Sequence, residues 1–192
     1  MKITSSDLIH TYGSIGLNMD YAVRLSVRLT DDIKKEDIIR ATELTAKRYP
    51  YMSVRMTHND SEIFYEKNEE KVAVINTSER ITLCGAESNY HIWAVAYYND
   101  YIHLDIYHGM LDGTGMYMVL STLLYYYCNI RYGLTDHTGI RTLDDEINPL
   151  ENADPLENVP GLDEIPKPRF DEAFSLIRDA GLTRCECKVW DI

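Results

Sequence analysis

The sequence predicts an α/β fold in which a mixed, largely antiparallel sheet is packed by helices in two layers. Its 192 residues suit a single domain with a substantial core. Several short runs alternate apolar and polar residues at the period of a strand, and two longer runs repeat apolar residues at the period of a helix. The composition, 45% hydrophobic and 26% charged, is typical of a globular protein.

The amino-terminal part predicts a strand followed by a helix. Residues 21–29 (YAVRLSVRL) alternate cleanly and indicate a half-buried strand. Asp31 or Asp32 is expected to cap a helix over 34–49, whose acids lie early and whose bases lie late, as the helix dipole favours. Pro50 is expected to end that helix.

The middle of the chain predicts more strands and a second helix. Asn99-Asp100 separates two alternating runs and indicates a hairpin turn. The further strand candidates are 51–56, 62–67, 72–76 and the two halves of 91–108. Apolar residues then repeat at helical spacing at Met116, Val119, Leu120, Leu123 and Tyr127.

Other aromatic and histidine side chains in this region are interpreted structurally. Trp93 is expected in the core, and His91 and His103 as structural or surface residues. The tyrosines of 123–132 are expected to line core and interface.

Two regions divide the chain. Residues 1–132 carry the predicted sheet and helices, whereas 133–192 are interpreted as an acidic, proline-rich segment followed by a short helix and a terminal strand. Residues 142–166 contain no Lys or Arg, and their acids are expected to form a solvated face.

Charge and composition argue against several classes of function. A net charge of −12 without a run of Lys and Arg argues against a nucleic-acid partner. It does not argue against a small anionic ligand, because a few local hydrogen-bond donors can outweigh the net charge. No apolar run approaches the ~20 residues of a membrane span, and no signal peptide is recognised, so a cytoplasmic protein is expected. The four cysteines show no Cys-x-x-Cys spacing, so neither a disulfide framework nor a metal site is expected.

One stretch, YIHLDIYHGMLDGTG (101–115), carries recognisable chemistry. His108 follows Ile102, Leu104 and Ile106 on one predicted strand face and leads into a turn. A neutral imidazole held at such a strand end suits a general base, which contributes typically ~10²–10⁴-fold to a rate. The plainer interpretation is a hydrogen-bonded core histidine beside an ordinary Asp-Gly turn.

Asp112 and Gly113 are candidates for supporting that turn. A carboxylate at Asp112 can cap the following helix or pair with a buried Arg. Gly113 is expected to permit a backbone conformation or a close approach that a side chain would block.

The stretch YHGMLDGTG resembles the His-His-x-x-x-Asp-Gly signature of the chloramphenicol-acetyltransferase-like superfamily. That superfamily includes nonribosomal-peptide condensation domains, plant acyltransferases and alcohol acetyltransferases. The resemblance covers roughly residues 5–132: residues 29–56 resemble the family's first helix and its RHP-x-L-R segment, and 89–127 resemble the alcohol-acetyltransferase branch.

The resemblance implies a role for each motif residue. His108 stands at the position of the base, which deprotonates a hydroxyl, amine or thiol for attack on a thioester, usually acyl-CoA. Asp112 matches the structural Asp that pairs with an Arg, and Gly113 matches the Gly. Acyl-CoA is therefore expected as a co-substrate, with a small-molecule acceptor and no permanently bound cofactor.

The sequence departs from the family pattern in three places. Tyr107 replaces the first His, and Ser53 stands where condensation domains carry an Arg, which leaves Arg24 or Arg55 as the candidate partner of Asp112. No Asp-Phe-Gly-x-Gly motif of a second lobe is present.

The favoured explanation for the missing motif is that the chain is the amino-terminal lobe of a longer enzyme. The alternative is that another copy of the chain supplies the second wall of the catalytic tunnel. The predicted function is acyl-CoA-dependent O- or N-acyl transfer. A non-catalytic binding or scaffolding module on the same fold is the second hypothesis.

Overall fold

The computed structural model describes residues 22–58 and 63–153, and the backbone alone at His58 and Ile63. The short helix and the terminal strand predicted within 171–190, together with Cys185 and Cys187, lie outside these residues. Within the described ranges, no helix is both long enough and apolar enough to cross a membrane.

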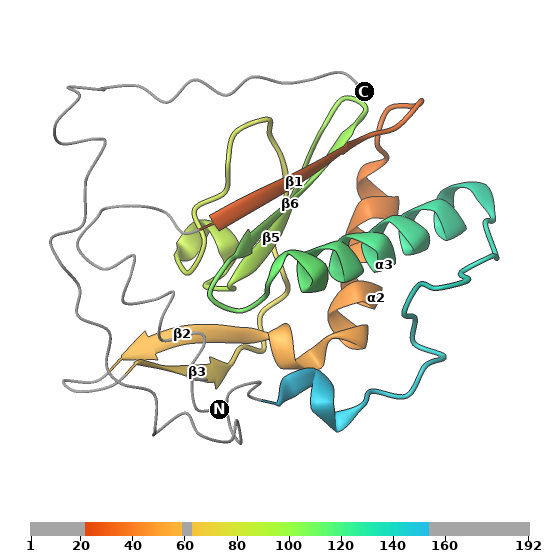
Figure 1. Ribbon diagram of the computed structural model, residues 1–192. Coiled ribbons are helices and arrows are strands. Elements are labelled where there is room, and N and C mark those ends of the chain that lie inside the picture. The colour runs from red at the N-terminus through yellow and green to blue at the C-terminus, as the bar shows by residue number, and fades with distance from the viewer. Residues whose placement is uncertain (1–21, 59–62, 154–192) are drawn as a thin grey trace, which may run out of the picture. The chain divides into compact units, whose positions relative to one another are not determined.

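The main sheet has four strands in the order β1-β6-β5-β4 (Figure 1). Neighbouring strands are antiparallel except β4 and β5, which are parallel, so the sheet is mixed and largely antiparallel as predicted. The strand bounds are Ala22–Arg28 for β1, Val74–Asn76 for β4, Trp93–Tyr98 for β5 and Tyr101–Tyr107 for β6.

The predicted hairpin joins β5 to β6. Asn99 adopts a φ of 51°, a left-handed conformation that Asn tolerates better than most residues, and Asp100 completes the turn. Strands β2 (Val54–His58) and β3 (Ile63–Lys67) form a separate antiparallel pair. The predicted strand at 51–56 begins only at Val54, because Pro50–Met52 forms a 3₁₀ turn (η1).

Helices α2 (Lys35–Arg48) and α3 (Gly113–Tyr132) pack against each other and share one hydrophobic core with the sheet. The apolar residues of the predicted periods in β6 and α3 are buried, although the end of β6, from Leu104 to Tyr107, is buried on both faces. They include Ile102, Leu104, Ile106, Met116, Val119, Leu120, Leu123 and Tyr127, and Trp93 of β5 lies among them.

The predicted cap of α2 is wrong. The helix begins at Lys35 behind Lys34, which offers no side-chain cap. The Ile33 amide donates to the carbonyl of Asn99 over 2.8 Å, which keeps the chain extended beyond Asp31 and Asp32. Asp31 instead accepts a hydrogen bond from the Tyr132 hydroxyl.

The acidic segment after α3 packs partly onto the core. Thr142 is buried, the Leu143 amide donates to the Tyr126 hydroxyl, and Thr122 of α3 donates to the carbonyl of Arg141. The segment ends in a 3₁₀ turn, η3 (Pro149–Asn152). Its acids Asp144, Asp145 and Glu146 are exposed as expected, but Glu151 is not.

Candidate functional site

His108 is the first residue after β6 and opens the turn that leads to α3. Tyr107, the last residue of β6, pairs with Ala22 of β1 and donates its amide to the carbonyl of Ile92 over 2.8 Å. These bonds fix the strand end, and therefore the backbone from which His108 projects. His108 is partly exposed, unlike the fully buried apolar row that precedes it on β6.

The turn after His108 is tight because of Gly109. The amide of Met110 donates back to the carbonyl of Tyr107 over 3.2 Å. A Cβ atom at Gly109 would collide with the ring of Tyr107. Any larger residue at 109, a position that the sequence did not single out, would therefore require the buried Tyr107 ring to move.

Asp112 is the N-cap of α3. Its Oδ1 accepts a hydrogen bond from the Gly115 amide over 2.8 Å, which satisfies one of the free donors at the helix start. The expected Arg partners are engaged elsewhere: Arg24 pairs with Asp105, and Arg55 with Glu66. Of the two roles considered for Asp112, the structure contains the cap.

Gly113 differs from the expectation. Its φ lies outside the left-handed region, and a Cβ atom there would meet nothing within 4 Å. Gly115 is more confined, because its Cβ would lie 3.0 Å from the Leu111 side chain and 3.4 Å from Asp112 Oδ1. The close approach that was expected at 113 therefore occurs two residues later.

A buried ion pair that the sequence did not reveal lies near the same end of the sheet. Arg24 of β1 donates to both carboxylate oxygens of Asp105 of β6, over 2.7 and 2.6 Å. Its Nη1 donates to the carbonyl of Ser78, and Nη2, which also bonds to Asp105, donates to the carbonyl of Glu79, over 2.6 Å each. Asp105 lies on the face of β6 opposite Leu104 and Ile106. The loop after β4 contacts this ion pair, and Ile81 of that loop donates its amide to the same carboxylate.

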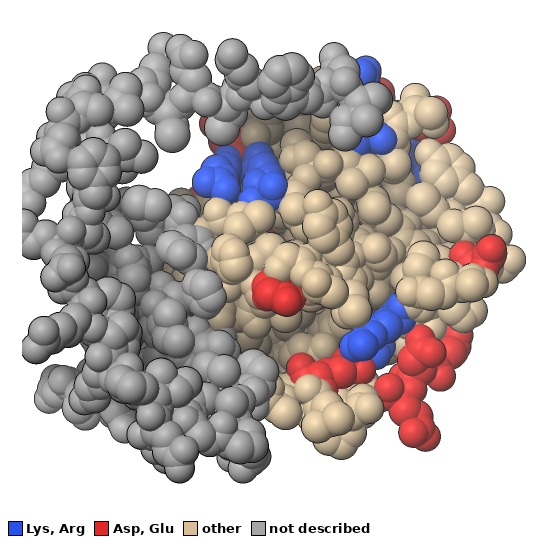
Figure 2. All heavy atoms as spheres, viewed as in Figure 1, with Lys and Arg blue, Asp and Glu red and all other residues tan. Residues whose placement is uncertain are grey.

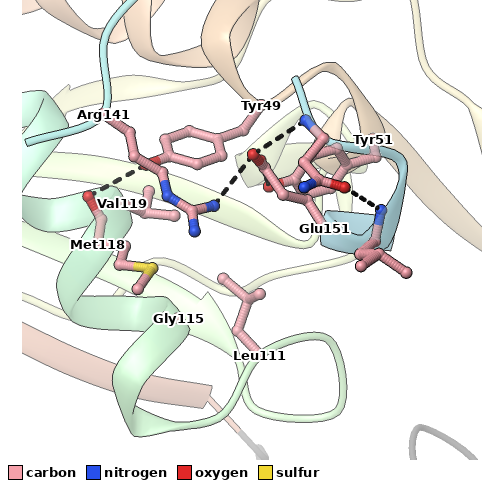
Figure 3. Close-up of a pocket in the computed structure, with 10 residues that line it drawn as sticks. Tyr49, Tyr51, Leu111, Gly115, Met118, Val119, Arg141 and Glu151 are labelled. Carbon is pink, nitrogen blue, oxygen red and sulfur yellow. Dashed lines mark hydrogen bonds and ion pairs between the residues drawn. The ribbon is translucent and has the colours of Figure 1, made fainter. Parts of the chain in front are cut away.

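A cavity of about 240 Å³ lies beside the motif, between α3 and the segment that follows it (Figure 3). We call it the Arg141 pocket. Leu111 and Gly115 of the motif line it, whereas His108 is not among its lining residues. The remaining lining residues are Tyr49, Tyr51, Met118, Val119, Arg141, Asn148, Leu150 and Glu151.

Glu151 forms hydrogen bonds or ion pairs with three side chains at this pocket. Arg48, at the end of α2, donates to both of its carboxylate oxygens over 3.0 Å each, and Tyr51 donates its hydroxyl over 3.0 Å. Arg141 lies 3.1 Å from the same carboxylate. The hydrogen bonds from Arg48 lower the pKa of Glu151 from 4.5 to about 2, while burial raises the pKa of Tyr51.

Within residues 22–58 and 63–153, no group of three or more His, Cys, Asp or Glu side chains is arranged to hold a metal ion. On the face shown in Figure 2, uncharged residues cover most of the described surface, and acids and bases lie in small groups between them. His91 is fully buried, and its Nε2 bonds to the carbonyl of Glu70.

Comparison with known proteins identifies the fold. No family model and no curated protein matches the sequence. Among solved structures, the starter condensation domain of rhizomide synthetase RzmA matches with a TM-score of 0.51 and 12% identity over 71% of this chain. The first condensation domain of the calcium-dependent antibiotic synthetase, in complex with a substrate analogue, matches with a TM-score of 0.51 and 11% identity over 69%.

The chain has the fold of part of a condensation domain. It covers 39% of the rhizomide synthetase domain and 38% of the antibiotic synthetase domain. Polyketide synthase associated protein 5 from Mycobacterium tuberculosis is similar at 13% identity and a TM-score of 0.53, over 69% of this chain and 34% of that protein. The predicted chloramphenicol-acetyltransferase-like fold is confirmed by these matches, while the alcohol-acetyltransferase branch stays a prediction.

Proposed function

We propose that this chain provides the base-bearing part of an acyltransferase, in which His108 activates an acceptor hydroxyl or amine for attack on an acyl-CoA thioester. The observation that carries the proposal is the position of the motif. The His-x-x-x-Asp-Gly sequence occupies the corner between β6 and α3 in a condensation-domain-like fold, and its histidine is partly exposed.

The chemistry assigns one proton transfer to His108. The Nδ1 atom of the ring is buried, so we assign the role of base to Nε2. Nε2 takes the proton of the acceptor as the acceptor oxygen or nitrogen bonds to the thioester carbonyl carbon. The C–S bond then breaks, and the thiolate of coenzyme A leaves and recovers a proton.

Asp112 and Gly109 act on the position of His108 rather than on the substrate. Asp112 fixes the start of α3 by its cap, and Gly109 lets the turn close against Tyr107. Together with the β6 pairings, these contacts fix the backbone on both sides of His108 relative to the sheet. Such positioning of a catalytic group contributes a large part of the rate enhancement of many enzymes.

Acyl-CoA is proposed as the donor because a variant of the rhizomide synthetase domain has been solved in complex with C8-CoA. That structure matches with a TM-score of 0.54 and 11% identity, over 70% of this chain and 37% of that domain. Because the chain covers well under half of these domains, we propose that a second lobe, or another copy of the chain, supplies the opposite wall of the site.

The test is acyl transfer from acetyl-CoA and octanoyl-CoA to a panel of small alcohols and amines. The reaction is monitored by measuring the free thiol of coenzyme A that it releases. His108→Ala is expected to lower the rate by about 10²-fold or more, because it removes the base. His103→Ala is the matched control, since it changes a histidine of β6 that lies outside the motif. Equal rates for wild type and His108→Ala would favour the alternative of a non-catalytic binding module.

A further inference from the structure

We infer that the Arg141 pocket binds the carboxylate of a small acyl acceptor whose apolar body rests on α3. The acceptor would then be a hydroxy acid or an amino acid, with its hydroxyl or amine directed toward the motif corner. This inference rests on the proposed function, because it names the substrate class of the same site.

The first observation is the balance of charge at the pocket wall. The carboxylate of Glu151 uses both oxygens to neutralise Arg48, whose side chain is only 1% exposed. Arg141 shares one of those oxygens at 3.1 Å. Two guanidinium groups therefore share the carboxylate of Glu151. The further acid near Arg48, Asp145, is exposed and accepts a hydrogen bond from the Thr142 amide.

The second observation is the direction of Arg141. Figure 3 shows its side chain extending from the segment after α3 into the pocket, with one nitrogen near Glu151. The side chain is 40% exposed, so a ligand can reach it. A guanidinium group binds carboxylates through two parallel N–H groups, which a lysine or a hydroxyl cannot reproduce.

The two tyrosine hydroxyls of the wall already have partners. The Tyr49 hydroxyl lies 2.9 Å from Thr122 Oγ1 and 3.3 Å from the carbonyl of Met118. The Tyr51 hydroxyl donates to Glu151. Arg141 is therefore the lining group best placed to bind an anion, and the two tyrosines contribute ring surface.

The size and lining of the pocket define the rest of the ligand. Leu111, Met118 and Val119 provide apolar contacts, and Figure 3 shows them around the same space as Arg141. A volume of about 240 Å³ is below the roughly 300–1,000 Å³ of sites for drug-sized ligands. A short aliphatic or aromatic acid fits this description, whereas a large acceptor does not.

The pocket adjoins the motif through two of its lining residues. Leu111 lies in the turn that follows His108, and Gly115 begins the lining on α3. His108 itself does not line the pocket. The inferred acceptor, anchored at Arg141 with its apolar part on Leu111, would therefore have to extend beyond the pocket to reach the imidazole.

The experiment measures binding of 2-hydroxy-4-methylpentanoate and of its neutral primary amide to the full chain by calorimetry or ligand-detected NMR. The acid is expected to bind at least about tenfold more tightly than the amide, because only the acid forms charge-assisted hydrogen bonds with Arg141. Arg141→Gln is expected to abolish this preference, and Arg141→Lys to retain part of it.

Arg40→Gln is the control, since it removes one positive charge from an exposed position of α2 outside the pocket. It is expected to leave the preference for the acid unchanged. Equal affinities for acid and amide, no saturable binding of the acid up to its solubility limit, or an unchanged preference in Arg141→Gln would each overturn the inference.

Binding to His108→Ala separates this inference from the proposed function. That variant is expected to keep the preference for the acid and to lose acyl transfer. An acid preference that depends on Arg141, together with transfer that is insensitive to His108, would contradict the proposed function alone. Transfer that depends on His108 without any acid preference would contradict the inference alone.

Discussion

Arg48 and Glu151 lie 103 positions apart in the sequence and form a two-fold hydrogen-bonded ion pair, with both N–O distances at 3.0 Å. The exposed fractions of the two side chains are 1% and 9%. A charge as deeply buried as that of Arg48 is stable only with a partner, because its loss of hydration must be offset by an opposite charge. The pair therefore fixes the segment after α3 against the end of α2.

Removing the negative charge of this pair is expected to destabilise the protein. In Glu151→Gln, Arg48 keeps its buried position but loses the opposite charge, which costs about 3 kcal/mol in comparable buried pairs. Urea denaturation followed by circular dichroism gives the free energy of unfolding. Glu146→Gln is the control, because it changes an exposed acid of the same segment, and an equal loss in both variants would contradict the assigned role of Glu151.

The same pair predicts a dependence of stability on pH. The pKa of Glu151 is about 2 in the folded protein, against 4.5 as its ordinary value. The unfolded chain binds more protons in this window, so the stabilisation by Glu151 is fully present above pH 4.5 and is lost as the pH falls toward 2. The difference in unfolding free energy between wild type and Glu151→Gln should therefore shrink over this range. A constant difference down to pH 2 would contradict the ion pair.

Local patterns in the sequence predicted most of the regular structure. The alternation in β1 and β6, the Asn99-Asp100 turn and the apolar repeat of α3 each depend on residues close together in the chain. These local patterns predicted the elements correctly because the apolar side chains that form each pattern also form the core. The predicted cap at Asp31 or Asp32 failed because a distant carbonyl, that of Asn99, holds the chain extended before α2.

The charged pairs could not be predicted in the same way. Arg24 with Asp105, and Arg48 with Glu151, join residues from different elements, and no spacing rule connects them. Glu151 also lies in a segment whose acidity suggested only a solvated face. The turn at His108 was found from its motif, but the glycine that confines it is Gly109 and not Gly113.

The cap at Asp112 predicts a modest and specific loss of stability. Asp112→Ala removes the acceptor of the Gly115 amide, which costs about 1 kcal/mol for a typical N-cap. Asp112→Asn keeps a side-chain oxygen at the same place and is expected to retain most of the stability. Thermal or urea unfolding of the two variants gives the comparison, and a larger loss in Asn than in Ala would contradict the capping role.

His91 predicts a second pH effect near neutrality. Burial lowers the pKa of His91 below its ordinary value of 6.5, so the folded state favours the neutral ring. The unfolded chain then binds more protons just below pH 6.5, and stability falls as the pH decreases through that value. His91→Gln removes this titration and keeps a donor for the carbonyl of Glu70. NMR titration of the His91 ring is the direct measurement, and a midpoint above 6.5 would contradict the prediction.

Two glycines of the motif region predict opposite effects of the same substitution. A Cβ atom at Gly109 collides with the ring of Tyr107, so Gly109→Ala is expected to destabilise the protein and to displace the turn that carries His108. A Cβ atom at Gly113 meets open space at the first position of α3, so Gly113→Ala is expected to stabilise by about 0.5 kcal/mol through the unfolded state. Urea unfolding measures both changes. Gly113→Ala also tests the proposed second wall of the site: a lower rate of acyl transfer without a loss of stability would support the close approach of another surface at 113.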